Sequence, residues 1–362
     1  MGVPGPRARV VAGHASRTSR SVPPAPRPAE LALPLEYVLP LRWGRDADPR
    51  DAVELAAYLE RLATWLPVTV VDGSEPDVWQ RHHALFAPYA RHVAPQPWPG
   101  RNGKVAGVVT GLSLAREELV VIADDDVRWE RDGLERLVGL LAGCTLVRPQ
   151  NVFAELPWHA RWDTARSLLN RAVGADYPGT YGVRRSAFLA AGGYDGDVLF
   201  ENLELARTLR AAGGSERLVP DLYVPRLPPT TRHFLGQRVR QAYDDLAQPA
   251  RLVAEAALGP AVLALAALTR RPATRRAAGR GLALLVAGSV GLAEVGRRRA
   301  GGAQVYPRDA ALWAPLWVAE RAVCVWLALG HRARGGVPYG GQRIRVAAHS
   351  VRRLRPAVAR LR

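Results

Sequence analysis

The sequence predicts an α/β protein with a doubly wound and mainly parallel sheet, followed by an apolar helical region. Short apolar runs typical of buried strands alternate with longer segments that have the apolar spacing of helices. Acidic residues directly follow two of these runs, and ligands bind beyond the carboxyl ends of strands in open α/β sheets. After Pro249 the alternation stops, and three long apolar runs are separated by arginines.

Extended and helical segments follow one another along the first two thirds of the chain. The expected strands are residues 37–41, 68–71, 92–99, 119–123, 144–148, 179–183 and 217–224. The expected helices are residues 51–66, 76–90, 105–114, 134–141, 157–172, 187–191, 203–212 and 233–246. This order favours helical crossovers and therefore parallel strands.

Composition divides the chain into four regions. They are a basic arm at residues 1–34 that we expect to be disordered, a sheet domain at 35–248, an apolar helical region at 249–330 and a basic tail at 331–362. The chain has 50 Lys+Arg against 33 Asp+Glu, a formal net charge of +17 that suggests an anionic partner. The arginines are not interleaved with aromatic residues and no recognition motif is present, so nucleic acid is not expected.

Cysteine usage and the N-terminus favour a cytoplasmic sheet domain. Cys144 and Cys324 rule out a disulfide framework, and their spacing fits no zinc site. We also expect no secretory signal peptide, because the first residues contain no apolar segment.

The apolar runs at residues 252–269, 281–296 and 310–330 have two interpretations. The first run would be about 27 Å long as a helix, close to the thickness of a bilayer core. A hairpin that dips into the membrane, with an interfacial third helix, would keep the arginines at the cytoplasmic surface. The alternative is a soluble domain of alanine-rich helices, and the membrane interpretation is favoured.

The acidic run Asp124, Asp125 and Asp126 directly follows the expected strand at residues 119–123. Adjacent carboxylates repel one another unless a cation lies among them, and their oxygens suit Mn²⁺ or Mg²⁺. The alternative for this run alone is a solvated turn or a helix cap.

Two residues upstream have matching chemistry. Asp72 ends the second expected strand, where a carboxylate can accept hydrogen bonds from a base or a ribose. Lys104, the only lysine, follows Asn102-Gly103 at the start of a helix and would be a compact charge for a diphosphate. An ordinary Asp-Gly turn and a generic helix cap are the alternatives.

Taken in order, these motifs resemble the nucleotide-sugar half of the family 2 glycosyltransferases. Residues 179–195 look like the acceptor-side strand and helix of that family, and residues 201–205 resemble its Glu-Asp-x-Asp-Leu segment. Residues 237–241 resemble the Gln-x-x-Arg-Trp motif of its processive and membrane-bound members. The resemblance covers residues 36–248, and the apolar tail resembles the membrane-bound branch, including ceramide-glucosyltransferase-like enzymes.

This resemblance implies a glycosyltransferase A-type fold and a role for each motif residue. Asp124 and Asp126 match the Asp-x-Asp pair, one on the ribose or uracil side and one on the metal, with Asp125 between them. Asp72 and Lys104 would bind the donor. Gln237 and Arg240 would close over the pyrophosphate or the sugar.

The general base is the one departure with chemical consequences. Asn202 stands where the family has its base Asp, and an amide does not accept a proton usefully at neutral pH. Glu201 is the first substitute and Glu204 the second, because a slightly earlier helix start would put them on one face. Gln241 replaces the Trp of the family motif, which weakens any inference of polymer synthesis.

The resemblance therefore implies a metal-dependent, inverting, hexosyltransferase-like enzyme of cell-envelope glycan synthesis. It would move a sugar from a nucleoside-diphosphate donor to a lipid, lipid-linked or glycan acceptor at the cytoplasmic face of the cell membrane, with Mn²⁺ or Mg²⁺ as cofactor. The alternative is a catalytically impaired nucleotide-sugar-binding membrane scaffold or partner subunit, favoured by Asn202. A sugar-phosphate nucleotidyltransferase is a weaker third hypothesis, because residues 40–46 are not the glycine-rich, arginine-bearing loop it needs.

Overall fold

The computed structural model describes residues 32–359. Most of the predicted basic arm therefore lies outside the described residues. The strands are β1 (Glu36–Leu41), β2 (Val68–Asp72), β3 (Arg91–Val93), β4 (Leu119–Ala123), β5 (Leu146–Phe153), β6 (Thr180–Arg184), β7 (Glu216–Arg226), β8 (Val337–Tyr339) and β9 (Gln342–Ile344). The α-helices are α1 (Pro49–Ala63), α2 (Pro76–Phe86), α3 (Gly103–Leu114), α4 (Arg131–Leu141), α5 (Trp158–Val173), α6 (Arg185–Ala190), α7 (Glu201–Ala211), α8 (Thr231–Asp244), α9 (Pro249–Leu268), α10 (Arg275–Arg298), α11 (Ala314–Ala333) and α12 (Val351–Ala359), and short 3₁₀ turns are η2 (Asp245–Ala247), η3 (Arg299–Gln304) and η4 (Ala310–Trp313).

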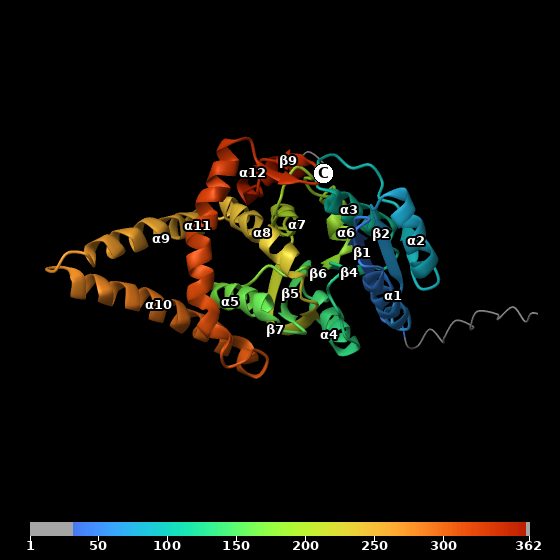
Figure 1. Ribbon diagram of the computed structural model, residues 1–362. Coiled ribbons are helices and arrows are strands. Elements are labelled where there is room, and N and C mark those ends of the chain that lie inside the picture. The colour runs from blue at the N-terminus through green and yellow to red at the C-terminus, as the bar shows by residue number, and fades with distance from the viewer. Residues whose placement is uncertain (1–31, 360–362) are drawn as a thin grey trace, which may run out of the picture. The chain divides into compact units, whose positions relative to one another are not determined.

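The large sheet confirms the predicted fold class. Its order is β3-β2-β1-β4-β6-β5-β7, with helices on both faces (Figure 1). β1 pairs in parallel with β2 and β4, β2 with β3, and β5 with β7, whereas β6 is antiparallel to β4 and β5. The chain enters β6 beside the end of β4, where the Asp124 amide donates to the Gly179 carbonyl at 2.8 Å. The reversed strand thus brings its first residues to the acidic run.

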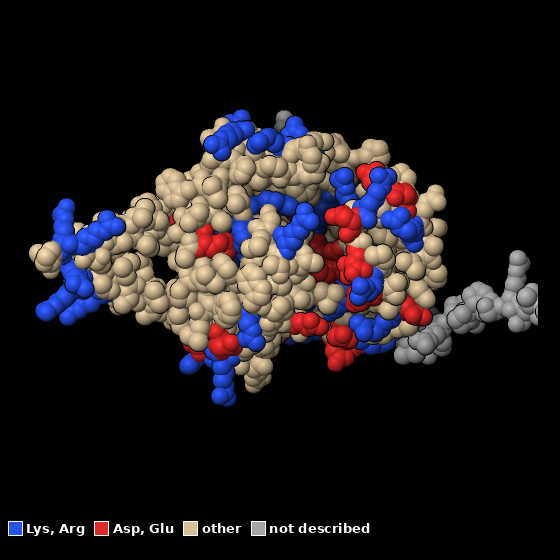
Figure 2. Space-filling view, in the orientation of Figure 1, with Lys and Arg blue, Asp and Glu red and all other residues tan. Residues whose placement is uncertain are grey.

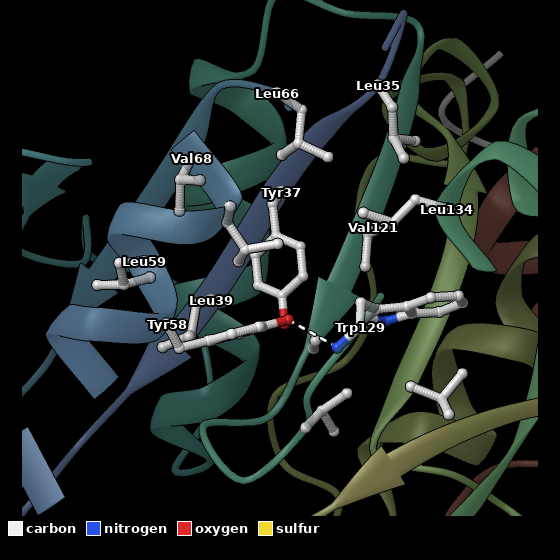
Figure 3. Close-up of a cluster of buried hydrophobic side chains, with 14 of the residues drawn as sticks. Leu35, Tyr37, Leu39, Tyr58, Leu59, Leu66, Val68, Val121, Trp129 and Leu134 are labelled. Carbon is white, nitrogen blue, oxygen red and sulfur yellow. Dashed lines mark hydrogen bonds between the residues drawn. The ribbon is translucent and has the colours of Figure 1, made fainter. Parts of the chain in front are cut away.

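Alternate residues of the strands face two apolar cores, as the period of a strand requires. Tyr37 and Leu39 pack with α1 and α4 on one face of the sheet (Figure 3). Val38, between them, packs with α3, α6 and α7 on the other face. In the first core the Trp129 amide donates to the Tyr58 hydroxyl at 2.7 Å, which ties the loop after the acidic run to α1.

Helix α3 lies unusually close to β1. A Cβ atom added at Gly111 would lie 2.2 Å from Cγ1 of Val38, and one at Gly107 would lie 2.9 Å from Cβ of Pro40. Only glycine fits these contacts without a shift of the helix. They hold the N-terminus of α3, with Lys104, at the carboxyl edge of the sheet.

The three long apolar runs form α9, α10 and η4–α11. All three helical segments are long and apolar enough to cross a membrane, by length and composition. They differ in burial: 6% of the most apolar window is buried in α9, 11% in the segment containing α10 and 33% in the segment containing α11. α9 and α10 form a hairpin that extends away from the sheet, and α11 crosses its base (Figure 1).

The predicted basic tail is folded where it is described. β8 and β9 form a hairpin, and Leu199 and Phe200 donate to the carbonyls of Val346 and Ala347 at 3.0 and 2.8 Å. α12 then packs on α7. The segment that precedes α7 is therefore held by the last part of the chain.

Smaller differences concern element ends. The extended piece expected at residues 92–99 is a strand only over Arg91–Val93. β5 continues to Phe153, because it pairs with β7 beyond the expected end. α7 begins at Glu201, the earlier start that places Glu201 and Glu204 one turn apart.

Candidate functional site

The acidic run follows β4 in a loop that is held by hydrogen bonds to other elements. The amides of Arg128 and Leu227 donate to the carbonyls of Pro225 and Asp126 at 2.8 and 2.7 Å, which joins the loop to the end of β7. The Trp129 indole also donates to the Thr180 hydroxyl at 2.9 Å. The loop that carries the acids at 124–126 is thus held by contacts with β6 and β7.

Lys104 is the cation that pairs with the carboxylates at this edge of the sheet. Its Nζ lies 2.6 Å from Oδ1 of Asp124 and 2.6 Å from Oε1 of Glu201. Burial alone would lower the pKa of Lys104, but the two carboxylates raise it well above its usual range, so the ammonium stays charged. The preceding cap residue Asn102 accepts the Lys104 amide at 3.2 Å and donates to the Val198 carbonyl at 3.0 Å.

The other two acids have different partners. Asp126 forms an ion pair with Arg226, and its second oxygen, Oδ1, is buried without a hydrogen-bond partner among the described residues. Asp125 accepts a hydrogen bond from the Trp43 indole. Burial and the charge of Asp126 raise the pKa of Asp125 to about 6.

A cavity of about 560 Å³ lies beside these groups. It brings together most of the residues predicted from the sequence. Those that line it are Lys104, Asp124, Asp125, Glu201, Asn202, Gln237 and Arg240.

Three predicted residues lie near the cavity but do not line it: Asp72, Asp126 and Glu204. Asp72 is buried, with Oδ2 at 2.6 Å from Nδ1 of His82 and 3.2 Å from Nε2 of His92. Burial raises the pKa of Asp72, but hydrogen bonds from the histidines and Ser74 outweigh it and hold the pKa below its usual range. Its carboxylate also accepts the Ser74 amide at 2.8 Å, so it fixes the loop whose Gly73 lines the cavity.

Glu204 is fully buried and accepts two hydrogen bonds from His349. The backbone amide of His349 donates at 2.6 Å and its ring Nδ1 donates at 2.9 Å. This geometry does not suit the second candidate base, because neither oxygen reaches the cavity. Asp195, Glu204 and His349 could together hold a metal ion, with ligand atoms within 4.8 Å of one another. Since both Glu204 oxygens are already used, we assign the group a structural role.

The cavity face of α8 follows a helical period. Gln237, Arg240, Gln241 and Asp244 all line the cavity, at positions i, i+3, i+4 and i+7. The guanidinium of Arg240 lies 4.9 Å from the centroid of the Tyr339 ring. Asp244 could have been found by extending the period of the Gln-x-x-Arg motif by one turn.

Other lining residues gave no signal in the sequence. Tyr339 comes from β8, and its hydroxyl donates to Oδ1 of Asn102 at 3.0 Å. Arg251 of α9 and Arg321 of α11 extend the lining to the base of the apolar helices. Arg226 belongs to β7 and pairs with Asp126. No local pattern marks these contacts, which join segments far apart in the chain.

The residues fit a divalent cation at the acidic run. Asp124 and Asp126 supply hard oxygen ligands, and the buried Oδ1 of Asp126 has no partner among the described residues. Lys104 and Arg226 each occupy one oxygen of these two acids. The remaining oxygens are the ones available to an ion.

Residues 80–152 match the family model described as glycosyl transferase family 21. This segment resembles a family 21 glycosyltransferase. It contains Lys104 and the acidic run, so the match confirms the predicted resemblance to nucleotide-diphospho-sugar transferases over these two motifs. No curated protein sequence matches the chain significantly.

The solved structures that match the chain are distant. The mannosyltransferase PcManGT from Pyrobaculum calidifontis, in complex with GDP-Man and Mn²⁺, is 18% identical, with 81% of this chain and 86% of that chain covered and a TM-score of 0.44. Glucosyl-3-phosphoglycerate synthase from Mycobacterium tuberculosis, in complex with Mn²⁺, UDP-glucose and glycerol 3-phosphate, is 20% identical, with 56% and 74% covered and a TM-score of 0.36. Similarity at this level does not transfer a substrate or a mechanism.

Proposed function

We propose that the protein is a metal-dependent, inverting glycosyltransferase that moves a sugar from a nucleoside-diphosphate donor to a lipid or lipid-linked acceptor at the cytoplasmic face of a membrane. One observation carries the proposal. A single cavity joins Lys104, Asp124 and Glu201 to Arg251 and Arg321 at the base of the apolar helices. The family match over residues 80–152 supports the donor end of this cavity.

The donor end has the charges that a diphosphate needs. Lys104 offers a permanent ammonium at the N-terminus of α3, where backbone amides also favour anions. Gln237 and Arg240 enter the cavity from α8 and would hold the pyrophosphate or the sugar. Asp124 and Asp126 would hold Mn²⁺ or Mg²⁺, which when bound neutralises the charge on the leaving nucleoside diphosphate. Asp72 would act indirectly, by fixing the loop at Gly73.

The transfer also needs a group that removes the proton of the acceptor hydroxyl. Asn202 lines the cavity, and its amide donates to the Pro178 carbonyl at 3.2 Å. Glu201, the candidate base from the sequence, lines the cavity next to it but is held by Lys104. The base would therefore be another carboxylate that lines the cavity.

The acceptor end points to a lipid. α9 and α10 each contain a long apolar stretch, and a cluster of arginines lies at the tip of the hairpin (Figure 2). The exposed tip arginines are Arg270, Arg271, Arg275, Arg276 and Arg280. A hairpin that dips into the bilayer, as expected from the sequence, would immerse these charges in hydrocarbon, and we therefore revise this expectation.

If α9 and α10 both cross the bilayer, the tip arginines need not lie in hydrocarbon. α9 is about 30 Å long from its first turn, where Arg251 lines the cavity, to the tip of the hairpin. This length is close to the thickness of a bilayer core and would bring the tip arginines toward the opposite headgroups. Both ends of the hairpin then return to the side of the sheet. α11 packs on α8 with Arg321 paired to Asp245 at 3.0 Å, so it stays on that side as well.

A donor screen tests the proposal. Purified protein in phosphatidylcholine–phosphatidylglycerol nanodiscs is heated with UDP-, GDP- and dTDP-sugars, with and without Mn²⁺. At least one donor should raise the melting temperature only with Mn²⁺, and Asp126→Ala should abolish that shift. A donor shift that survives in Asp126→Ala contradicts the site assignment.

Asn202 favours a second candidate function, a nucleotide-sugar-binding scaffold without transferase activity. It predicts the same donor-dependent shift but no release of nucleoside diphosphate with any acceptor. Measuring both quantities in the same preparation separates the two functions.

A further inference from the structure

Five acidic side chains line the cavity, and four of them have partners. Asp124 and Glu201 are held by Lys104, and Asp125 accepts from Trp43. Asp245 forms ion pairs with both Arg251 and Arg321 at 3.0 Å. A carboxylate that is already neutralised by a cation is a poor acceptor for a further proton, which sets aside Asp124, Glu201 and Asp245. Asp125 has a neutral partner, but it belongs to the donor end, between the two proposed metal ligands.

Asp244 is the exception. It lines the cavity, yet within residues 32–359 it has neither an ion pair nor a hydrogen-bond partner for its buried Oδ1. Oε1 of Gln241 and Nε of Arg240, on the same face of α8, also lack partners among residues 32–359. Buried polar atoms without partners are rare in folded proteins, and a cluster of them on one cavity wall indicates a polar ligand.

We propose that Asp244 is the catalytic base of the transfer, taking the part for which Asn202 is unsuited, with Gln241 orienting the acceptor hydroxyl. The inference rests on the proposed function. In the step, the acceptor hydroxyl gives its proton to the Asp244 carboxylate as its oxygen bonds to the anomeric carbon. The bond from that carbon to the diphosphate oxygen breaks, and its electron pair leaves with the nucleoside diphosphate.

Glu201 has a different part in this arrangement. With Asp124 it holds Lys104 at the donor end, so it is a positioning residue for the diphosphate. The two residues therefore differ in what their loss should change: acceptor activation for Asp244, donor affinity for Glu201.

The charges around Asp244 give the reaction a pH signature. Burial, Asp245 and Glu201 raise the pKa of Asp244 well above its usual range, against the opposing effects of Arg240 and Arg321. Because a base must be ionised, the rate should rise with pH through a midpoint above that of an ordinary aspartate.

The test measures release of nucleoside diphosphate by the full chain in nanodiscs, with Mn²⁺, the donor found by thermal shift, and diacylglycerol, a lipid with a free hydroxyl, as acceptor. Asp244→Asn should lower the rate about a hundredfold to ten-thousandfold, the usual contribution of a general base, while the donor-dependent thermal shift stays unchanged. Asp244→Glu should keep measurable activity with a displaced acid limb. The control Asp132→Asn, an exposed acid in the first turn of α4, should behave as wild type.

Glu201→Gln is the rival variant. It should raise the KM for the donor and leave the acid limb in place. The inference is overturned if Asp244→Asn keeps its rate and pH profile, or if Glu201→Gln binds donor normally and loses the acid limb. If the wild type binds donor and releases no diphosphate, the transferase function itself fails, and the inference fails with it. Should Asp244→Asn misfold, the displaced limb of Asp244→Glu decides.

Discussion

Lys104 joins acidic residues of the site that come from different elements. It is the only lysine of the chain and bridges Asp124 and Glu201, which belong to the ends of β4 and α7. Without the ammonium, two carboxylates would face each other beside the space proposed for a diphosphate. Loss of Lys104 should therefore disturb both the arrangement of these carboxylates and the binding of the donor.

Replacing Lys104 with Met should weaken donor binding. A charge-assisted hydrogen bond contributes about 1.5–3 kcal/mol, so the Kd for the donor should rise about tenfold to a hundredfold. Isothermal titration with Mn²⁺ present measures it. The control is Arg101→Met, an adjacent cation outside the cavity lining that pairs with Asp197 at 3.6 Å. Equal affinities in wild type and Lys104→Met would contradict the donor assignment.

The site residues could be grouped from the sequence more readily than their side chains could be oriented. Lys104, Asp124 and Glu201 meet as expected, because the ends of neighbouring elements converge at one edge of the sheet. Asp126 turns toward Arg226, and Glu204 toward His349. The direction of a side chain on a loop or a helix depends on partners from distant segments, which no local pattern reveals.

At the scale of elements, the close contact of α3 with β1 sets the position of Lys104. Gly111→Ala forces a methyl against Val38, and overpacking of this kind costs about 1–3 kcal/mol. We therefore expect a lower free energy of unfolding and weaker donor binding, measured by denaturant titration and thermal shift.

The matched control for Gly111→Ala is Gly139→Ala in α4, where an added Cβ meets nothing within 4 Å. There the helix propensity of alanine should stabilise the protein by about 0.5–1 kcal/mol. Equal effects of the two substitutions would show that α3 is not held by close packing.

His349 fastens the C-terminal segment to α7. Its hydrogen bond with Glu204 raises its pKa, against the effect of burial. The protonated ring therefore stabilises the folded protein fully below the ordinary histidine pKa of about 6.5, and that contribution is lost as pH rises through the raised pKa.

His349→Gln should consequently lower the free energy of unfolding by about 1.5–3 kcal/mol at low pH, the range for hydrogen bonds to charged groups. The difference from wild type should shrink as the pH rises. Urea titrations at several pH values measure it, and a difference that is constant or grows with pH would contradict this role.

The elements themselves were largely predictable, since their apolar periods are strong. The reversed direction of β6 and the β8–β9 hairpin were not predicted. Both features depend on how strands pair. A short apolar run can predict a strand, but it does not indicate the direction of that strand or its partner.

At the scale of the whole molecule, we propose that the apolar hairpin lies in a bilayer and the cavity at its surface. Leu263 and Leu284 are each 71% exposed on the two helices of the hairpin. Replacing both with Asp should reduce co-flotation with phosphatidylcholine–phosphatidylglycerol vesicles and leave Mn²⁺-dependent donor binding intact. Val53→Asp in α1, 59% exposed, is the control. Unchanged flotation of the double variant would argue for a soluble helical region.

The most direct measurement is transfer itself. The full chain in nanodiscs is incubated with labelled nucleotide sugars and diacylglycerol, with Mn²⁺ or with EDTA, and the label in the lipid phase is counted. We expect label from at least one donor to enter the lipid phase with Mn²⁺ and none to enter it with EDTA. A donor that binds in the presence of Mn²⁺, with neither transfer to lipid nor release of nucleoside diphosphate, would contradict it.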